Sequence, residues 1–322
     1  MNMQIVDGSG VRARLSMREC IDVMAKAMTA VSKGTVSMPS RNVMPLIDNS
    51  GFFAVMPGSV SDPLVYGAKI VSLHPANAVH GQPVLQGFVA LFDHHSGAPV
   101  ALIDGAELTA LRTAAASALA TRLLSRSNAR TLGLLGCGVQ AVSHLEAICA
   151  VRDIEEVRVW GRSPEKAAAF AERHADSITA AILPVTSAQD AAACDVVCVA
   201  TAAHESVIRG AWVRPGAHVN LVGAHASTTR ESDTALIKHS RQYVDSLSAA
   251  FSEAGDILIP IEEGGIDRSH VIGEIGALVL GRIIGRQTPE DITVYKSVGV
   301  VAQDLIAAHA VYTSASRVDA HS

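Results

Sequence analysis

A glycine-rich turn with the sequence GCGVQA occupies residues 136–141, between an apolar run and a segment with helical spacing. Gly136 permits a tight turn, and Gly138 lets the backbone approach a pyrophosphate group closely. Ala141 keeps the helix near the strand, and the N-terminus of that helix then faces the anion. The pattern predicts a dinucleotide-binding site. The residues of the turn that we expect to contact the cofactor are Gly136, Gly138, Val139, Gln140 and Ala141.

The end of the next expected strand, residues 160–163 with the sequence WGRS, bears on which dinucleotide is bound. Sites for NAD(H) usually carry an Asp or Glu here, which holds the ribose 2′-hydroxyl. Residues 160–163 contain no carboxylate, whereas Arg162 and Ser163 can bind a 2′-phosphate through charge and a hydroxyl hydrogen bond. We therefore expect NADP(H) as the preferred cofactor and NAD(H) as the alternative. Alternatively, Arg162 is simply an exposed arginine beside a helix cap and contacts no cofactor.

Three basic residues in the first 125 are candidates for holding an anionic substrate: Arg41, Lys69 and Arg112. Lys69 stands in an apolar strand, and Arg112 stands in an alanine-rich helix, where its charge must find a partner. Taken singly, each of these residues would more often be a solvated or salt-bridged side chain than a substrate-binding one.

Strands and helices alternate in short cycles from about residue 128 to residue 246. Such alternation is typical of βαβ units and a parallel sheet. We expect strands at 129–136, 156–161, 180–186, 195–201, 218–224 and 242–246, and helices at 140–151, 163–175 and 187–193. Residues 126–299 are therefore expected to form a Rossmann-type, doubly wound parallel sheet domain.

The first 125 residues predict a different, α+β domain. An amphipathic helix at 17–32 precedes several strand-like runs, and a long alanine-rich helix follows at 107–125. The strand-like runs are 50–58, 65–73, 85–93 and 99–105. A last helix, expected at 296–316, would pack back across this domain, so that residues 300–322 join it.

The composition excludes several classes of protein. Of 322 residues, 49% are hydrophobic and 18% charged, which is too apolar for a disordered chain. A net charge of −5 argues against a nucleic-acid binder, and no apolar run is long enough for a membrane helix. The first residues lack the basic start and long apolar run of a secretory signal, so we expect none. Five cysteines without a C-x-x-C pair, and histidines without ligand spacing, suggest neither a disulfide framework nor a metal site. We expect a cytoplasmic protein with no membrane or nucleic-acid partner.

Several motifs occur together in one order. They are GQPVLQGFVALFDHHSGAPVALIDGAELTALRTAAASALATRLL, the GCGVQA turn, WGRSPEKA, HVNLVGAH followed by ESD, and YKSVGVVAQD. Over nearly the whole chain they resemble the ornithine cyclodeaminase/mu-crystallin family. The resemblance implies a homodimer. It also implies that the first domain, 1–125, binds substrate and forms the dimer interface, and that the second is a Rossmann domain.

The resemblance assigns roles to individual residues. Arg41, Lys69 and Arg112 would surround the carboxylate and reacting nitrogen of an imino or amino acid, with Lys69 and Arg112 as catalytic residues. Lys69 would bind the carboxylate or set the protonation of the imine, its pKa lowered by the neighbouring arginines. The cofactor would be contacted by Thr113, Gly138, Val139, Gln140, Arg162, Ser163 and Thr201, and near the nicotinamide by Ser297 and Gly299.

One departure from the founding members of the family bears on the reaction. Cyclodeaminases carry an aspartate after the glycines of the fifth strand, where this chain has Val222-Gly223-Ala224-His225. A histidine cannot hold a cationic amine as a carboxylate does. His225 is thus expected either to bind substrate or merely to shape the cleft.

These motifs resemble those of the family's imine and amino-acid reductases. The expected reaction is reduction of Δ1-pyrroline-2-carboxylate to L-proline by NAD(P)H, and also of Δ1-piperideine-2-carboxylate to L-pipecolate. Three alternatives remain: an amino-acid dehydrogenase like alanine dehydrogenase, an ornithine cyclodeaminase, and a non-catalytic small-molecule binder loaded with NADPH.

Overall fold

The computed structural model describes residues 3–319, and the side chains of residues 3–314. The chain forms two compact units, residues 1–112 together with 300–322, and residues 113–299. The division falls inside the long helix α3 (Gly105–Leu124), whereas the sequence predicted a boundary at residue 125. The reason is that the second half of α3 bonds to the second unit. Ser117 Oγ lies 2.9 Å from His144 Nε2, and Asn220 Nδ2 donates to Thr121 Oγ1 at 3.0 Å.

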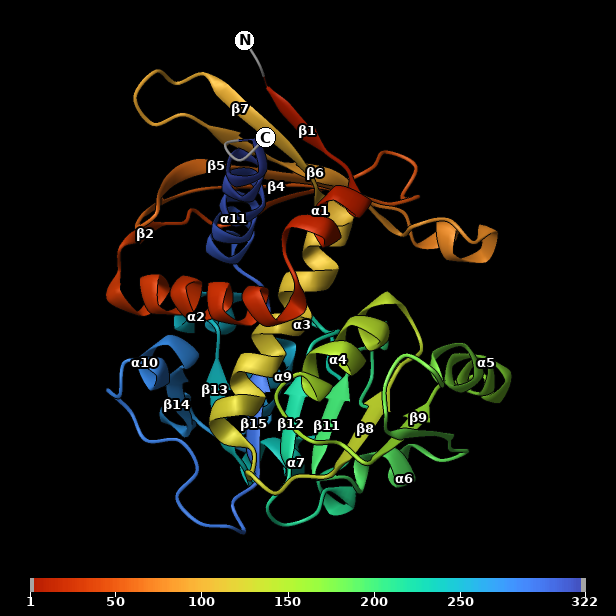
Figure 1. Ribbon diagram of the computed structural model, residues 1–322. Coiled ribbons are helices and arrows are strands. Elements are labelled where there is room, and N and C mark those ends of the chain that lie inside the picture. The colour runs from red at the N-terminus through yellow and green to blue at the C-terminus, as the bar shows by residue number, and fades with distance from the viewer. Residues whose placement is uncertain (1–2, 320–322) are drawn as a thin grey trace. The chain divides into compact units, whose positions relative to one another are not determined.

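The first unit contains a seven-stranded sheet with the order β1-β7-β6-β5-β4-β2, and β3 pairs with β4. The strands are β1 (Gln4–Val6), β2 (Val36–Ser37), β3 (Asn42–Pro45), β4 (Phe52–Ser61), β5 (Leu64–Leu73), β6 (Leu85–Phe92) and β7 (Pro99–Asp104). The helices are α1 (Gly8–Arg14), α2 (Met17–Lys33), the short Pro75–His80 helix, the start of α3, and α11 (Val301–Asp319). Figure 1 shows α11 lying against one face of this sheet.

Helix α11 approaches β4 and β5 closely because glycines stand where it crosses them. A Cβ on Gly58 would lie 2.6 Å from Val301 Cγ1, and one on Gly67 would lie 3.3 Å from Leu305 Cδ2. The side chains that face α11 from these strands are buried, as strand alternation requires.

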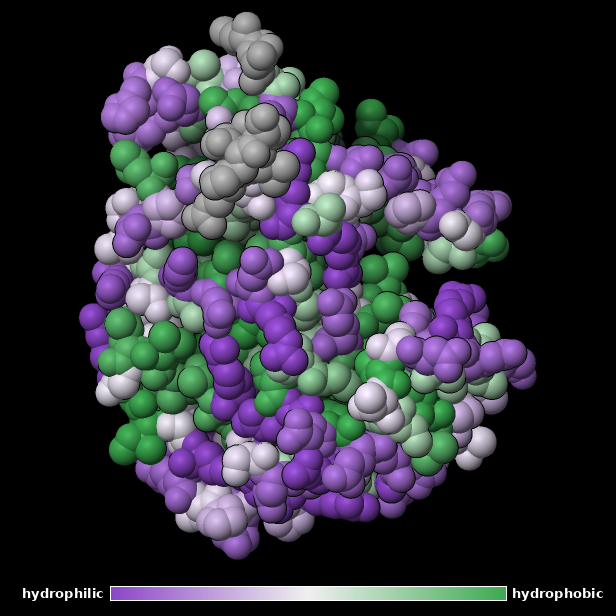
Figure 2. All heavy atoms as spheres, in the orientation of Figure 1, coloured by the Kyte–Doolittle hydropathy of each residue, from purple (hydrophilic) through white to green (hydrophobic). Residues whose placement is uncertain are grey.

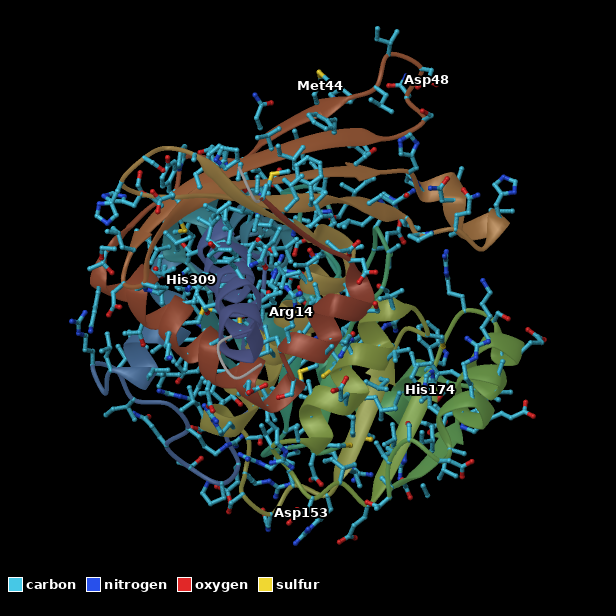
Figure 3. The ribbon with its side chains drawn as sticks, turned by 45° about the horizontal axis from the view of Figure 1, so that its top comes forward. Arg14, Met44, Asp48, Asp153, His174 and His309 are labelled. Carbon is cyan, nitrogen blue, oxygen red and sulfur yellow. The ribbon has the colours of Figure 1, made fainter. Side chains whose placement is uncertain are left out.

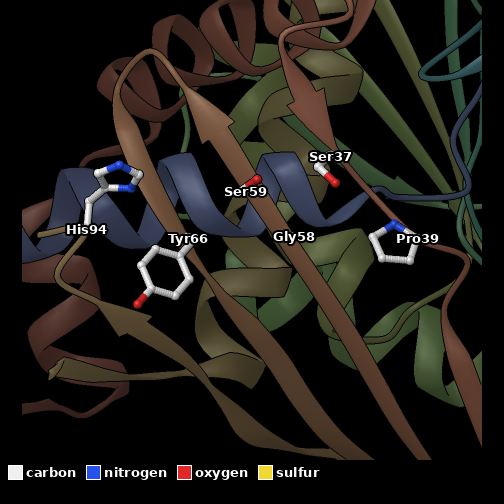
Figure 4. A pocket seen from close by; sticks show the side chains of 6 residues that line it. All are labelled: Ser37, Pro39, Gly58, Ser59, Tyr66 and His94. Carbon is white, nitrogen blue, oxygen red and sulfur yellow. The ribbon is translucent and has the colours of Figure 1, made fainter. Parts of the chain in front are cut away.

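The opposite face of the same sheet is apolar and exposed. Alternation and strand register place Ile5, Met44, Phe53 and Phe88 on this face, with exposed fractions of 76%, 52%, 36% and 37%. Met44 extends away from α11 in Figure 3. Figure 4 shows an open hollow on this side of the strands, with α11 behind them. The hollow is lined by Ser37, Pro39, Gly58, Ser59, Tyr66 and His94.

The second unit is built on an eight-stranded parallel sheet with the order β10-β9-β8-β11-β12-β15-β13-β14. Its strands are β8 (Thr131–Leu135), β9 (Glu156–Trp160), β10 (Ala181–Pro184), β11 (Val196–Val199), β12 (His218–Leu221), β13 (Arg241–Val244), β14 (Val271–Glu274) and β15 (Thr293–Lys296). Its helices, besides the rest of α3, are α4 (Val139–Cys149), α5 (Pro164–His174), α6 (Ala188–Ala192), α7 (Thr234–Lys238), α8 (Leu247–Glu253), α9 (Gly255–Glu262) and α10 (Ile275–Val279), with short helices at Gly210–Trp212 and Arg268–His270. Helices lie on both faces of the sheet (Figure 1), as expected of a doubly wound fold.

Two strands of this sheet, β14 and β15, were not predicted. β15 lies between β12 and β13, so Lys296 ends a central strand and does not begin a helix, as the sequence had suggested. Gly299, with φ of +76°, turns the chain, and α11 then begins at Val301. Four-residue strands give too few alternations for periodicity to distinguish them from a helix start.

The strands at the centre of the second unit are buried, and hydrophilic residues gather over the loops at its lower end (Figure 2). Among the described residues, no helix has the length and apolar character needed to cross a membrane.

Candidate functional site

The predicted glycine turn joins the carboxyl end of β8 to α4. Gly136 has φ of +122°, and a Cβ there would lie 2.4 Å from the carbonyl oxygen of Ala200. Its N–H donates to the carbonyl of Trp160 at 2.8 Å, which ties the ends of β8 and β9 together. Ala141 is buried. The first glycine is therefore required by backbone geometry.

Gly138, the N-cap of α4, is not required by the protein's own backbone geometry. Its backbone, with φ −93° and ψ −171°, suits any residue, and no atom lies within 4 Å of the position that a Cβ would take. It brings no side chain to cap the helix, whose first N–H groups lack intrahelical partners. Gln140 Oε1 is buried without a hydrogen-bond partner in the described part of the chain, and Val139 is 69% exposed. An open backbone at a positive helix end fits the pyrophosphate of a dinucleotide.

Arg162 and Ser163, at the end of β9, differ in their surroundings. The Arg162 side chain is exposed. Ser163 caps α5: its hydroxyl accepts from Lys166 N at 3.3 Å and donates to Glu165 Oε2 at 2.6 Å. That hydroxyl bond lowers the pKa of the Glu165 carboxyl. A carboxylate thus stands beside Ser163, two positions beyond residues 160–163, which contain none.

The basic residues of the first unit meet at a buried carboxylate. Asp304, near the start of α11, accepts at Oδ1 from Lys69 Nζ at 3.1 Å and from Arg112 Nε at 2.9 Å. Lys69 comes from the centre of β5 and Arg112 from α3, and all three side chains are buried. Asp304 is the partner that the charge of Arg112 required.

Neutral groups complete this cluster. Lys69 Nζ donates to Thr109 Oγ1 at 2.6 Å, and Arg112 Nη1 donates to Gln303 Oε1 at 2.7 Å. Among the described residues, these bonds leave one Lys69 proton, Arg112 Nη2 and Asp304 Oδ2 without a partner. Two cations and one carboxylate give the cluster a net positive charge, which suits an anion with several acceptors.

Burial lowers the pKa of Lys69 to about 8; Asp304 opposes this shift, and the positive charges of Arg112 and Arg41 add to it. The sequence predicted the direction but attributed it to the arginines. Burial would raise the pKa of Asp304, yet Arg112 and Lys69 outweigh it and hold that pKa below its usual value. Asp304 therefore carries its negative charge at neutral pH.

Three other candidates, Arg41, Thr113 and His225, lie in three different segments. Arg41 precedes β3 and influences Lys69 electrostatically, as its effect on the lysine pKa shows. Thr113 follows Arg112 in α3 and is buried. His225 is exposed after β12, with Nδ1 2.9 Å from the carbonyl oxygen of Gly223.

Thr201, Ser297 and Gly299 stand in loops at the carboxyl ends of β11 and β15. The Thr201 hydroxyl donates to the buried Glu231 at 2.8 Å. The N–H of Gly299 donates to the buried carboxylate of Asp245 at 2.7 Å, and that of Ser297 donates to the carbonyl of Leu221 at 3.0 Å. These loops are therefore fixed by groups of the second unit itself.

No site role was predicted from the sequence for two buried carboxylates: Asp304, which pairs with Lys69 and Arg112, and Glu231, which holds the Thr201 loop. Asp304 and Glu231 lie in motifs that carried the family resemblance, VAQD and ESD. A signal was available for Asp304, because a buried lysine and arginine demand a nearby acid. Among the described residues, no group of three or more His, Cys, Asp or Glu side chains is arranged to hold a metal ion.

The parallel sheet and glycine turn define a protein with a Rossmann-type dinucleotide-binding unit, to which the first unit adds a buried cationic cluster. The chain belongs to the ornithine cyclodeaminase/mu-crystallin family, whose family model matches residues 2–319.

Three relatives illustrate the family. Δ1-Pyrroline-2-carboxylate reductase of Bacillus cereus (strain ATCC 10987 / NRS 248) is 34% identical over 315 residues, 97% of each chain. The structure of Δ1-pyrroline-2-carboxylate reductase of Thermococcus litoralis with NADH and L-proline is 36% identical, with a TM-score of 0.95 over 98% of each chain. An archaeal alanine dehydrogenase dimer with bound NAD is 30% identical, with a TM-score of 0.91 over 99% of this chain and 98% of that one.

We predict that Gly138→Ala weakens NADH binding about tenfold or more without lowering stability. The added methyl group meets no protein atom, but it fills the space through which the backbone would approach a pyrophosphate. Fluorescence titration with NADH measures the affinity, and thermal unfolding of the free protein measures the stability.

Gly136→Ala is the matched control. Its Cβ would meet the Ala200 carbonyl at a strained φ, so this variant should lose both stability and NADH binding. Unchanged NADH affinity in Gly138→Ala would contradict the assignment of the turn.

Proposed function

We propose that the protein reduces cyclic ketimine acids with NAD(P)H, converting Δ1-pyrroline-2-carboxylate to L-proline and also Δ1-piperideine-2-carboxylate to L-pipecolate. The observation that carries this proposal is the sharing of Asp304 by buried Lys69 and Arg112. Such a cluster, with net positive charge and spare donors, is suited to a small carboxylate. Relatives named for this reaction cover nearly the whole chain.

In this reaction Arg112 and Lys69 hold the substrate carboxylate, and Arg41 adds positive charge. The cofactor, when bound, supplies a hydride to carbon 2 of the protonated imine, which becomes the secondary amine of the product. A protonated imine is already electrophilic, so the chain's main contribution is to grip and orient it. Lys69, with its pKa near 8, can donate a hydrogen bond to the carboxylate, or can set the protonation of the imine by giving a proton to its neutral nitrogen.

An amino-acid dehydrogenase that takes ammonia and an open-chain 2-oxo acid is the second candidate. The 30% identity to an archaeal alanine dehydrogenase favours it. The same carboxylate grip would serve a 2-oxo acid, and the need for free ammonia distinguishes the two reactions. The absence of an aspartate at Val222–His225 weighs against a cyclodeaminase.

The test follows the oxidation of NADPH, and separately of NADH, with ammonia-free Δ1-pyrroline-2-carboxylate. Rapid oxidation is expected, and Arg112→Ala should lose most of it. Oxidation that begins only when ammonia and pyruvate are added would move the assignment to the dehydrogenase. Near-normal turnover by Arg112→Ala would overturn the proposed carboxylate grip, and tight NADPH binding without turnover of any imine would favour the non-catalytic binder.

We predict that the KM for the imino acid rises as the pH increases through about 8. Below that pH the Lys69 ammonium is charged and holds the carboxylate; above it, the charge and a hydrogen bond are lost. Initial rates between pH 6.5 and 9.5 measure this, with the KM for NADH as the internal reference.

Lys69→Met is the control for this pH dependence. Its KM should be about tenfold higher or more at pH 7, consistent with the loss of a charged hydrogen bond, and should rise no further with pH. If the KM values of the wild type and of Lys69→Met rise with pH in the same way, the rise comes from titration of the substrate, which would contradict the assignment to Lys69.

We also propose that NADP(H) is preferred over NAD(H), on the strength of exposed Arg162 and the lack of a carboxylate at residues 160–163. Glu165, bonded to Ser163, opposes this preference, so the arginine must supply most of it. Structural relatives bind NAD or NADH.

We predict that Arg162→Ala raises the KM for NADPH about tenfold and leaves that for NADH nearly unchanged, because only a 2′-phosphate needs the guanidinium. The KM ratio of the two cofactors is the measurement. Arg173→Ala, at the other end of α5, is the control. An equal effect of Arg162→Ala on both cofactors would contradict the preference.

We propose that the protein is a homodimer formed by the apolar sheet face that carries Ile5, Met44, Phe53 and Phe88. Exposed apolar patches of this kind mark interaction sites, and a structural relative is a dimer. A cytoplasmic location is proposed with it, since all five cysteines are free.

Phe88→Asp should convert the dimer to a monomer, because a charge would be buried in the apolar interface. Light scattering during size-exclusion chromatography measures the mass. Ile284→Asp, at an exposed position of the second unit, should leave the mass unchanged. A dimer that survives Phe88→Asp would contradict this interface.

A further inference from the structure

Glu231 connects two loops at the carboxyl edge of the parallel sheet. It is fully buried, and its Oε1 accepts from the N–H and the hydroxyl of Thr201, both at 2.8 Å. Its Oε2 accepts from the N–H groups of Val222, Gly223 and Ala224 at 3.2, 2.6 and 3.3 Å. One carboxylate thus joins the loop after β11 to the loop after β12.

Lys296 and Asp256 extend this junction to a third strand. Lys296, at the end of β15, lies 2.9 Å from Asp256 Oδ2 and donates to the carbonyl of Ala224. Asp256 Oδ1 accepts from the N–H groups of Glu231 and Ser232, each at 2.9 Å. Both charged side chains are fully buried. The network therefore fixes the backbone of the β12 loop from both its N–H and its carbonyl side.

The position of the two loops in the sheet indicates what they hold. A doubly wound sheet binds a dinucleotide along the carboxyl ends of its strands, one half on each side of the point where strand order reverses. Strands β8, β9 and β10 carry the glycine turn and Arg162 on one side, and β11 and β12 follow on the other. The loops at Thr201 and at Val222–Ala224 therefore belong to the nicotinamide half.

We propose that Glu231 is a positioning residue for hydride transfer: it holds the β11 and β12 loops in the one arrangement that orients the nicotinamide end of the cofactor. This inference rests on the proposed function. A carboxylate is suited to the task because it only accepts hydrogen bonds, and five donors converge on it. A glutamine in its place has one oxygen and one NH2 group, so its NH2 would face the donor groups of one of the two loops.

Glu231→Gln keeps the size of the side chain but removes the match between two accepting oxygens and the five donors. The variant should bind NADH with a Kd within about threefold of the wild type, because the glycine turn holds the other half of the cofactor. Single-turnover hydride transfer to Δ1-pyrroline-2-carboxylate should slow about 100-fold, the cost of misplacing reacting groups by about 1 Å. The emission maximum of bound NADH should shift, which reports the ring environment without any substrate.

Asp195→Asn is the matched control for mere structural damage. Asp195 lies at the amino end of β11 in the same sheet, and its Oδ2 accepts from Arg130 N, Thr131 N and Thr131 Oγ1 at 2.9–3.1 Å. This variant should lose stability while retaining the rate of hydride transfer and the emission of bound NADH. An equal loss of rate in both variants would overturn the positioning role.

Gly223→Ala tests the same junction with the charge of Glu231 intact. Its Cβ would lie 2.0 Å from the Thr201 carbonyl oxygen and 2.5 Å from Glu231 Oε1, so it forces the two loops apart. Gly223→Ala should show the same slow hydride transfer and the same shift in NADH emission. It therefore also provides the test if Glu231→Gln fails to fold. Unchanged transfer and emission in either folded variant would overturn the inference. A wild-type enzyme that reduces no imine would overturn the proposed function, and the NADH emission would still decide the role of Glu231.

Discussion

Two buried cations depend on one carboxylate in the first unit of this protein. Lys69 and Arg112 are taken out of water by β5, α3 and α11, and a buried charge without a partner is costly. Asp304 satisfies both cations and remains ionised because both stand beside it. Helix α11 begins at Val301 and crosses the sheet closely at Gly58 and Gly67. This close packing brings the Asp304 carboxylate within reach of Lys69 in β5. A cluster with net positive charge is the result.

In the second unit, buried carboxylates likewise satisfy buried groups, but here the groups are backbone N–H donors and not charged side chains. Its sheet ends in loops whose backbone N–H groups would be unsatisfied if they were simply buried. Buried carboxylates take these donors: Glu231 for Thr201 and Val222–Ala224, and Asp245 for Val298 and Gly299. Burial raises the pKa of Glu231 to about 7; Lys296 opposes the shift and Asp256 reinforces it. The ionised carboxylate, which accepts all five hydrogen bonds, is therefore the main form above that pH. These hydrogen bonds hold the loops in place, which solvent alone would not do.

Local patterns predicted much of this architecture. The alternation of strands and helices predicted the parallel sheet, and the GCGVQA turn lies where the sequence placed it, between β8 and α4. The structure shows why Gly136 is a glycine, since its φ is positive; the backbone at Gly138 is open, and its approach to a pyrophosphate stays a prediction. The resemblance to a family, carried by motifs spread along the chain, extended this to the expected residues of the site. The short strands β14 and β15 escaped prediction because four residues carry almost no periodicity.

The sequence by itself determined the class of fold, the dinucleotide turn and the types of residue available for an anionic substrate, because these depend on local geometry and composition. Only the tertiary structure decided which charges meet. Lys69 and Asp304 are 235 positions apart, and nothing local in β5 specifies the acid that α11 delivers. The same holds for Glu231, whose donors come from segments 7 to 30 positions away. The physical reason is that burial decides a charge's need for a partner, and burial is a property of the whole packed unit.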